Sequence, residues 1–370
     1  MWSFDVNIDT LIDNFAVVVE TDTPTKGSWQ LDYESFCTKF NIVRCPNISS
    51  VNTLEDKECC KAINAIIDLS NWRAMLLACC TTGSKVVEIS VHGCQLSAQH
   101  FVDLAAALKK MGSCQSLKLQ YLDWQNTDLT DVANNGQLQE ALTLIFSDTC
   151  CLEGISLKGN NFTSDFLAPI ITSLSQNFKL IYLNLANNLL DDSSVLAFLK
   201  AIRCCTNIKY VSFASNQTTG EHLSVLAQLL NGTEQSAEDD ATIKANSKSV
   251  GDKNKAIKEL NKKRKKAGQS DIREIPAVLD VAIKREKTMF LINRILKRLD
   301  FSNNALMKAE CVEAFAQCIA EAPQGLTLSQ AAATYQLETD PKLVLDFTGC
   351  SSAVSKDVNV DPQAWIHLAL

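Results

Sequence analysis

Apolar residues recur along much of the chain in one spaced pattern, LxxLxLxxNxL, in which the position written N holds Asn or Cys. The pattern is held by Val86, Ile89, Val91, Cys94 and Leu96; by Leu152, Ile155, Leu157, Asn160 and Phe162; by Leu180, Leu183, Leu185, Asn188 and Leu190; by Ile208, Val211, Phe213 and Asn216; and by Leu296, Leu299, Phe301, Asn304 and Leu306. Two weaker copies start at Cys114, with Leu122 in the Asn slot, and at Leu345, with Cys350 there. The starts at 86 and 114, and at 152, 180 and 208, are 28 residues apart, which is too regular for chance.

Each copy predicts a strand followed by a helix. The alternating apolar residues of LxxLxL are typical of a short strand with one buried face. The second half of a copy has apolar residues at helical spacing, as at Phe101, Leu104 and Leu108. The Asn slot falls in the turn between them, where a buried side chain must satisfy backbone groups. One such unit cannot bury its apolar face alone, so we expect neighbouring units to stack.

The spaced slots and the 28-residue period resemble the leucine-rich repeat family, in its ribonuclease-inhibitor-like subtype. The resemblance covers roughly residues 60–355, with interruptions. It implies an α/β fold, a curved solenoid with a parallel sheet on its concave face and helices on its convex face. The resemblance is specific for the fold and unspecific for the function.

The repeats divide the chain into four predicted segments. Residues 1–85 are an N-terminal cap or a small capping module, and residues 86–230 carry leucine-rich repeats. Residues 231–290 are a charged insertion. Residues 291–370 carry the C-terminal repeats and a C-terminal cap. Within the cap, alternation predicts strands at Trp2–Ile8 and Phe15–Val19, and the pattern of Ala62–Leu77 predicts an amphipathic helix.

The insertion joins an acidic stretch to a basic one. Its sharpest feature is the basic run Lys262, Lys263, Arg264, Lys265 and Lys266. Such a run is typical of a nuclear-import signal or of a contact for phosphate or an acidic partner. The stretch Lys253–Lys266 is also compatible with a helix, but the interpretation that we favour from sequence is a solvated loop without fixed structure. Because no aromatic residues interleave with the lysines, stacking on nucleic-acid bases is not supported.

Composition bears on compartment and partners. The net charge of −7 disfavours a globally basic nucleic-acid binder. The first residues lack the features of a secretory signal, and no apolar run is long enough to span a membrane, so no membrane partner is expected. The 15 cysteines include adjacent pairs and no CxxC, which favours reduced thiols. We therefore predict a cytoplasmic protein. The basic run at residues 262–266 leaves import into the nucleus as an alternative.

The sequence contains few of the residue patterns that are typical of catalytic sites. The four histidines are not spaced as metal ligands, and neither a nucleophile elbow nor a phosphate-binding glycine loop occurs. The prediction is a protein that is not an enzyme, with no metal, no cofactor and no small-molecule substrate.

The strand positions that point away from the helices are the candidate partner-binding site on the concave face. Its residues are Glu88, His92, Lys118, Lys158, Tyr182, Asn184, Tyr210, Arg298 and Asp300. Tyr182 and Tyr210 hold the same slot of consecutive repeats, so we expect them to lie side by side, as in a protein-binding hot spot.

The leading hypothesis is a non-catalytic scaffold for protein–protein interaction. The alternatives are a GTPase regulator, since GTPase activators share this repeat subtype, a substrate adaptor of a ubiquitin ligase, and a ciliary or cytoskeletal structural component. This chain has neither an acidic C-terminal tail nor an F-box pattern, and nothing in the residues selects the last alternative.

Overall fold

The computed structural model forms two compact units, which are described separately. The first comprises Met1–Ser173 with Tyr182–Asn188, and the second Leu174–Ile181 with Leu189–Leu370. The structure describes residues 15–53, 56–123, 136–147, 150–174, 177, 179–202, 208–226, 233–234, 237–266, 274, 289–290, 297–320, 344–347 and 350. The strand predicted at Trp2–Ile8 lies outside these residues.

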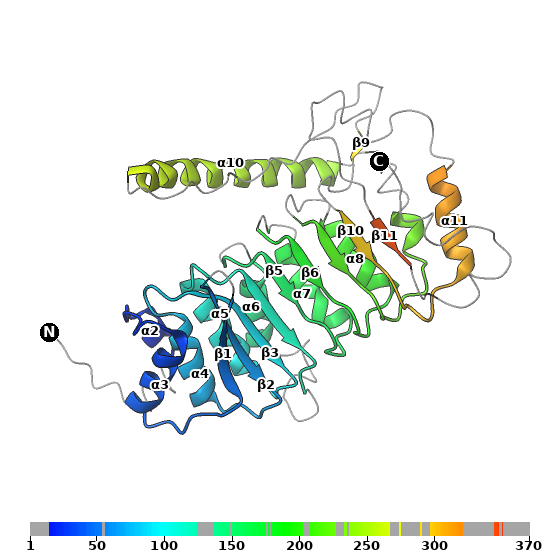
Figure 1. Ribbon diagram of the computed structural model, residues 1–370. Coiled ribbons are helices and arrows are strands. Elements are labelled where there is room, and N and C mark those ends of the chain that lie inside the picture. Colours follow the sequence, from blue (N-terminus) through cyan, green and yellow to red (C-terminus); the bar gives the residue numbers. More distant parts are fainter. Residues whose placement is uncertain are drawn as a thin grey trace. The chain divides into compact units, whose positions relative to one another are not determined.

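In the first unit, strands alternate with helices along the chain (Figure 1). The strands are β1 (Ile48–Asn52), β2 (Glu58–Ile63), β3 (Val86–His92), β4 (Ser116–Gln120), β5 (Gly154–Ser156) and β6 (Tyr182–Asn184). They lie in this order in one sheet, with β1 antiparallel to β2 and the following pairs parallel. The helices are α2 (Phe15–Glu20), α3 (Trp29–Lys39), α4 (Leu69–Cys79), α5 (Ala98–Lys110), α6 (Gly136–Ile145) and α7 (Ser164–Leu174). An α/β architecture with a mostly parallel sheet is thus confirmed.

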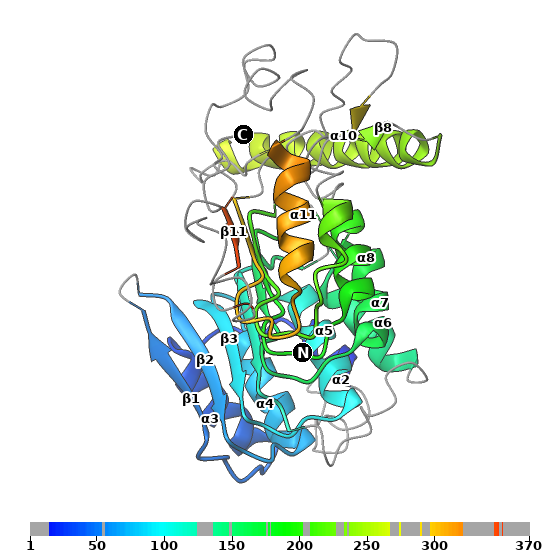
Figure 2. The same ribbon diagram turned by 90° about the vertical axis from the view of Figure 1, so that its right-hand side faces the viewer.

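The two faces of the strands differ as the apolar pattern predicts. In β3, Val86, Ile89 and Val91 are buried, whereas Glu88 and His92 are partly exposed. Helices α5, α6 and α7 lie together on one side of the strands (Figure 2). The apolar slots therefore face the helix layer, and the intervening residues form the other face.

Helix α5 shows why these segments become helices. Its apolar residues Phe101, Leu104 and Leu108 are buried on one side, as predicted. Ser97 and His100 form a capping box that satisfies the first backbone N–H groups. Lys109 and Lys110 lie in the last turn, where positive charge favours the helix dipole.

The helix predicted over Ala62–Leu77 is wrong at its start. Residues up to Ile63 belong to β2, which pairs in parallel with β3. Asp68 then accepts a hydrogen bond from the Asn71 backbone N–H at 2.9 Å and begins α4 at Leu69. Because Cys60 and Ala62 are small, they do not match the apolar pattern, so the sequence does not predict this strand. A further strand–helix unit therefore precedes the one at Val86.

The strand predicted at Phe15–Val19 is also wrong, because this segment is helix α2. Phe15 and Val19, four residues apart, are both buried, and α2 packs against α5. The Arg73 guanidinium lies 5.5 Å from the centre of the Phe15 ring. Burial at helical spacing outweighs the strand preference of the valines.

The second unit continues the alternation. Its elements are α8 (Asp192–Ile202), β7 (Tyr210–Ser212), β8 (Thr233–Glu234), α10 (Ala237–Lys266), β9 (Met289–Phe290), β10 (Arg298–Asp300), α11 (Ala309–Ala320) and β11 (Val344–Asp346). Strand β10 pairs in parallel with both β7 and β11, and β8 pairs with β9. The strands that flank the insertion are therefore neighbours, as the repeat pattern predicts.

The loop expected in the insertion is wrong for Ala237–Lys266, which form the 30-residue helix α10. This segment has no Pro, and its nine Lys and four Ala favour a helix. Pairs three residues apart, Lys255 with Asp252 at 3.6 Å and Lys262 with Glu259 at 2.6 Å, add local support.

The buried role of the Asn slot is confirmed in both units. In the first, Asn188 Nδ2 donates to the Leu157 and Leu185 carbonyls at 3.1 and 2.9 Å. Its Oδ1 accepts from the backbone N–H groups of Asn160 and Phe162 at 3.0 and 3.1 Å. In the second unit, Asn304 accepts in the same way from the Asn216 N–H at 2.8 Å, and Asn216 from the Leu190 N–H at 3.1 Å. Each Asn thus bonds its own turn to the turn of the preceding repeat.

The residue before the Asn slot has a left-handed backbone. Its φ lies between 51° and 76° at Gly93, Tyr121, Gly159, Asn187, Ser215 and Asn303. Gly, Asn and Ser tolerate this conformation or occur in turns, whereas a bulky side chain is strained there. Tyr121 is the exception in the series.

Candidate functional site

The strand face opposite the helices brings several predicted site residues into rows within the first unit. We call it the open strand face and define it by Glu88, Ser90, His92, Ser116, Lys118, Gln120, Gly154, Ser156, Lys158, Tyr182 and Asn184. The strand register places Glu88, Ser116, Gly154 and Tyr182 in one row. Lys118 and Asn184 share the next row with Ser156.

Two of the predicted charged residues neutralise each other. Lys118 Nζ lies 2.7 Å from Glu88 Oε2, and Ser116 Oγ donates to the same carboxylate at 3.0 Å. The Lys118 side chain is 42% exposed and that of Glu88 is 17% exposed, so the pair lies at the surface. This part of the face presents a compensated pair rather than a free charge.

Other polar residues of the face bond to neighbouring strands or to their own turns. Gln120 Nε2 donates to Ser156 Oγ at 2.6 Å, across neighbouring strands. Asn184 Oδ1 accepts from the Ala186 N–H at 2.9 Å, so this predicted site residue stabilises its own turn.

His92 and Lys158 meet around a residue that the sequence analysis did not select, Tyr121. The His92 and Tyr121 rings lie 5.1 Å apart at an angle of 57°, and Lys158 Nζ lies 5.8 Å from the Tyr121 ring centre. The Tyr121 N–H donates to the Lys158 carbonyl at 3.0 Å, which fixes the backbone. We call His92, Tyr121 and Lys158 the tyrosine cluster.

The Tyr121 ring can pack against residue 159 because this residue is glycine and has no side chain. A Cβ at residue 159 would lie 2.4 Å from two ring carbons, so the ring covers the glycine backbone directly. Asn64 lies over Gly93 in the same way. Tyr121 remains 38% exposed although its φ is 51°. A bulky, exposed ring held in a strained conformation marks a candidate functional residue.

Tyr121 could have been found from sequence by comparing the position before each Asn slot. That position holds small or turn-forming residues in the other repeats, at Gly93, Gly159, Asn187, Ser215 and Asn303. The aromatic residue stands out only when the repeats are aligned at this slot. Leu122 holds the Asn slot of this copy, so Tyr121 lies in the position directly before it.

The remaining predicted face residues lie in the second unit. Arg298 is exposed beside Tyr210, and Asp300 accepts from Ser212 Oγ at 2.9 Å and from the Ser302 N–H at 3.0 Å. Tyr182 belongs to the first unit and Tyr210 to the second, so their contact stays a prediction. Both tyrosines are about 40% exposed.

The basic run lies at the end of helix α10. Lys262 and Lys265 are exposed there. The run therefore sits on a regular scaffold, although the sequence analysis favoured a loop.

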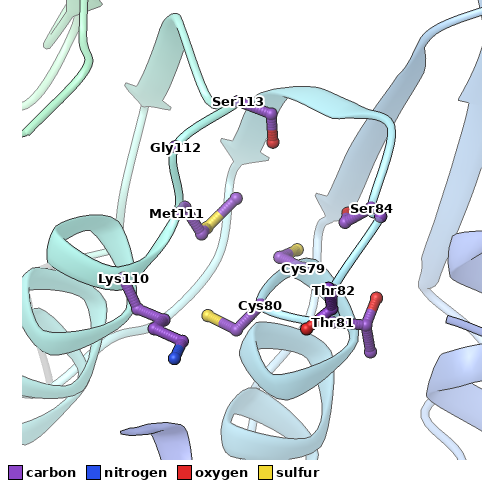
Figure 3. Close-up of a pocket in the computed structure, with 10 residues that line it drawn as sticks. Cys79, Cys80, Thr81, Thr82, Ser84, Lys110, Met111, Gly112 and Ser113 are labelled. Carbon is purple, nitrogen blue, oxygen red and sulfur yellow. The ribbon is translucent and has the colours of Figure 1, made fainter. Parts of the chain in front are cut away.

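A polar cavity of about 270 Å³ lies between the ends of α4 and α5 (Figure 3). Cys80, Thr81, Lys110 and Ser113 contribute to its lining. Lys110 is held by Asp22 at 2.8 Å, and burial raises the pKa of the Cys80 thiol well above its ordinary value. A protonated thiol is a poor nucleophile, so burial lowers the reactivity of Cys80 in this cavity.

The buried histidines have structural partners. His100 Nδ1 accepts from the Ser97 N–H at 3.0 Å, and its Nε2 donates to the Ile67 carbonyl at 2.9 Å. Burial lowers the pKa of His100, which favours the neutral ring that these bonds require. His222 Nδ1 lies 2.6 Å from Asp192 Oδ1, a link that the sequence analysis missed because 30 residues separate the partners.

Within the described part of the chain, no group of three or more His, Cys, Asp or Glu residues is arranged to hold a metal ion. The described helices include none that is long and apolar enough to cross a bilayer. The cysteines whose side chains the structure describes are free thiols.

No family model matches the chain, and no curated protein matches it.

Proposed function

We propose that this chain is a leucine-rich repeat protein of the ribonuclease-inhibitor-like subtype and that it is a non-catalytic scaffold. Its partner is a protein that docks on the open strand face, with the tyrosine cluster as the anchor. The second unit carries its own predicted face residues, Tyr210, Arg298 and Asp300, as a further candidate contact for a protein partner.

The family proposal is supported by the repeated slots and their hydrogen bonds. Strand–helix units recur at 28-residue steps, and the Asn-slot side chains bond successive turns. A side chain that satisfies the turn of the neighbouring repeat needs a stacked partner, which is the defining requirement of a repeat array.

One observation carries the choice of site: Tyr121 is exposed in a strained left-handed conformation. Strain at an exposed aromatic residue lowers stability, and the fold offers Asn at the same slot in other repeats. Tyr is also among the residues that contribute most to protein interfaces. The flanking His92 and Lys158 add a hydrogen-bonding ring and a positive charge, which suit a protein surface.

Affinity purification from the native cell tests this proposal. Tyr121→Asn removes the ring but favours φ near 51°, so its melting temperature should equal or exceed that of the wild type. A protein recovered with the wild type should be lost from this variant. Leu144→Ser is the matched control, because Leu144 is a comparably exposed apolar residue on helix α6.

Identical sets of bound proteins for the wild type and Tyr121→Asn would contradict the site. A large loss of stability in Tyr121→Asn would assign the ring a packing role instead. The GTPase regulator, the ubiquitin-ligase adaptor and the cytoskeletal component gain no specific support from these contacts.

A further inference from the structure

Exposed lysines follow one face of helix α10. They are Lys244, Lys248, Lys255, Lys258, Lys262 and Lys265. Their separations of three, four or seven residues place them within an arc of about 100° on the helix surface. At a rise of about 1.5 Å per residue, the row is about 31 Å long. We call these six residues the lysine stripe; Figure 1 shows α10 as one continuous helix.

A different face of α10 is covered. Val250 is buried, and Asn254, Ile257 and Asn261 are partly buried at helical spacing. The helix therefore already has an inner side, and the lysine stripe is not part of it.

The stripe already binds carboxylates. Lys255 contacts Asp252 at 3.6 Å, and Lys262 contacts Glu259 at 2.6 Å, both on α10 itself. Lys258 contacts Glu274, which lies beyond the helix, at 3.4 Å. Among the described residues, no carboxylate lies within ion-pair distance of Lys244, Lys248 or Lys265. The stripe thus has capacity for further carboxylates.

We propose that the lysine stripe is a second docking surface, independent of the open strand face, and that it binds an acidic helical segment of a protein partner. A helix with glutamates at three- and four-residue spacing repeats the stripe's own spacing, so the charges pair in register. Lysine supplies flexible point charges that adapt to single carboxylates.

Charge and composition disfavour other anionic partners. The whole chain carries −7 and residues 241–270 about +8, so the rest carries about −15 and repels an extended polyanion such as nucleic acid. Helix α10 contains no aromatic residue for base stacking or for a membrane interface.

Fluorescence anisotropy of the full chain with three labelled probes tests the proposal. The first is a peptide of about 21 residues, the length of the stripe, with glutamates on one helical face. The second has the same composition with glutamates around the whole helix. The third is a single-stranded DNA of equal charge. We expect the first probe to bind most tightly, with an affinity that falls as salt rises.

Two charge-matched variants separate the stripe from net charge. Lys244→Gln/Lys248→Gln/Lys265→Gln removes the three stripe residues that have no carboxylate at ion-pair distance among the described residues, and Lys253→Gln/Lys263→Gln/Arg264→Gln removes three basic residues at other positions around α10. Gln preserves helix propensity, which circular dichroism verifies. The stripe variant should lose about tenfold in affinity for the one-face peptide, as three exposed ion pairs would give, and the other variant clearly less.

Equal binding of the two peptides, tighter binding of DNA, or equal losses in the two variants would each overturn the proposal. These outcomes are distinct from those of the Tyr121 experiment, because α10 carries none of the open strand face.

Discussion

Two junctions between neighbouring repeats in the first unit are held together in different layers. Between the repeats that begin at Glu58 and Val86, the side-chain links lie among the helices, where Arg73 Nε meets Asp103 Oδ2 at 2.6 Å and Trp72 Nε1 donates to the His100 carbonyl at 2.9 Å. Between the repeats that begin at Leu152 and Leu180, the links lie in the turns, through Asn188. A repeat with Cys instead of Asn in this slot, as at Cys94, thus has another means of bonding to its neighbour.

The two kinds of link differ in how they fail. A buried ion pair that loses one partner leaves an uncompensated charge, whereas a lost amide leaves neutral groups unpaired. The helix-layer junction should therefore be the more sensitive to single substitutions.

The largest effect is expected for Asp103→Ala. Arg73 and Asp103 are almost fully buried, and the substitution removes the carboxylate that lies 2.6 Å from the guanidinium. The free energy of unfolding should fall by about 3–5 kcal/mol, measured by urea denaturation. Asp22→Ala, which removes an exposed pair with Lys110, should leave the midpoint unchanged. Equal midpoints for the two variants would show that the buried pair does not hold this junction.

Asn188→Ala should have the next largest effect, a loss of about 1–3 kcal/mol, because buried turn amides lose their partners. Its exposed neighbour Asn187 has φ of 55°, so Ala there is itself strained. Asn187→Gly is the suitable control and should be nearly neutral in the same denaturation experiment. A neutral Asn188→Ala would show that the turn layer is dispensable.

The substitution Asp192→Asn tests a third link, which lies in the second unit. Asp192 accepts hydrogen bonds from the Thr219 and Gly220 N–H groups at 2.8 and 3.1 Å and contacts His222. Burial alone would raise the pKa of Asp192, but the hydrogen bonds from His222 and Thr219 outweigh it and hold this pKa well below its ordinary value.

Because the pKa of Asp192 is depressed in the folded state, its stabilising contribution is complete above the unfolded pKa of about 3.9 and is lost as pH falls towards the folded value. The variant should cost about 1 kcal/mol at neutral pH and show a shallower loss of stability below about pH 4. Parallel pH profiles for variant and wild type would contradict this role.

Cys94→Ala should have the smallest effect, about 1 kcal/mol or less in urea denaturation. The Cys94 thiol contacts the His92 carbonyl at 3.4 Å and is a weak donor. A loss as large as that of Asn188→Ala would mean that the thiol and the amide are equivalent in this slot.

The alternation of strands and helices could be predicted from the sequence because each apolar or Asn slot is a local consequence of burial. Leu117 and Leu119 had to face the helices, and Asn188 had to satisfy its turn. The pairing of β7 with β10 across the insertion follows from the same slots at Val211 and Leu299.

The elements and site residues that the sequence did not predict depend on tertiary contacts. Phe15 and Val19 form a helix because α5 covers one side of it, and β2 escaped notice because Cys60 and Ala62 are small. At the candidate site, the exposed positions His92 and Lys158 were predictable, but Tyr121 joins them only through a backbone conformation that one sequence does not display.

The pairing of Arg298 with Tyr210 has a consequence for how the chain tolerates change in length. The two strands remain partners although 88 positions separate them, and the cost of closing such a connection rises by only about 0.6 kcal/mol for each doubling of its length. Apart from residues 213–226, which include Asn216 and His222, the segment between them can thus lengthen or shorten at little thermodynamic cost. This junction is a natural place for acquiring a new module during evolution, and equally for grafting a reporter domain by design.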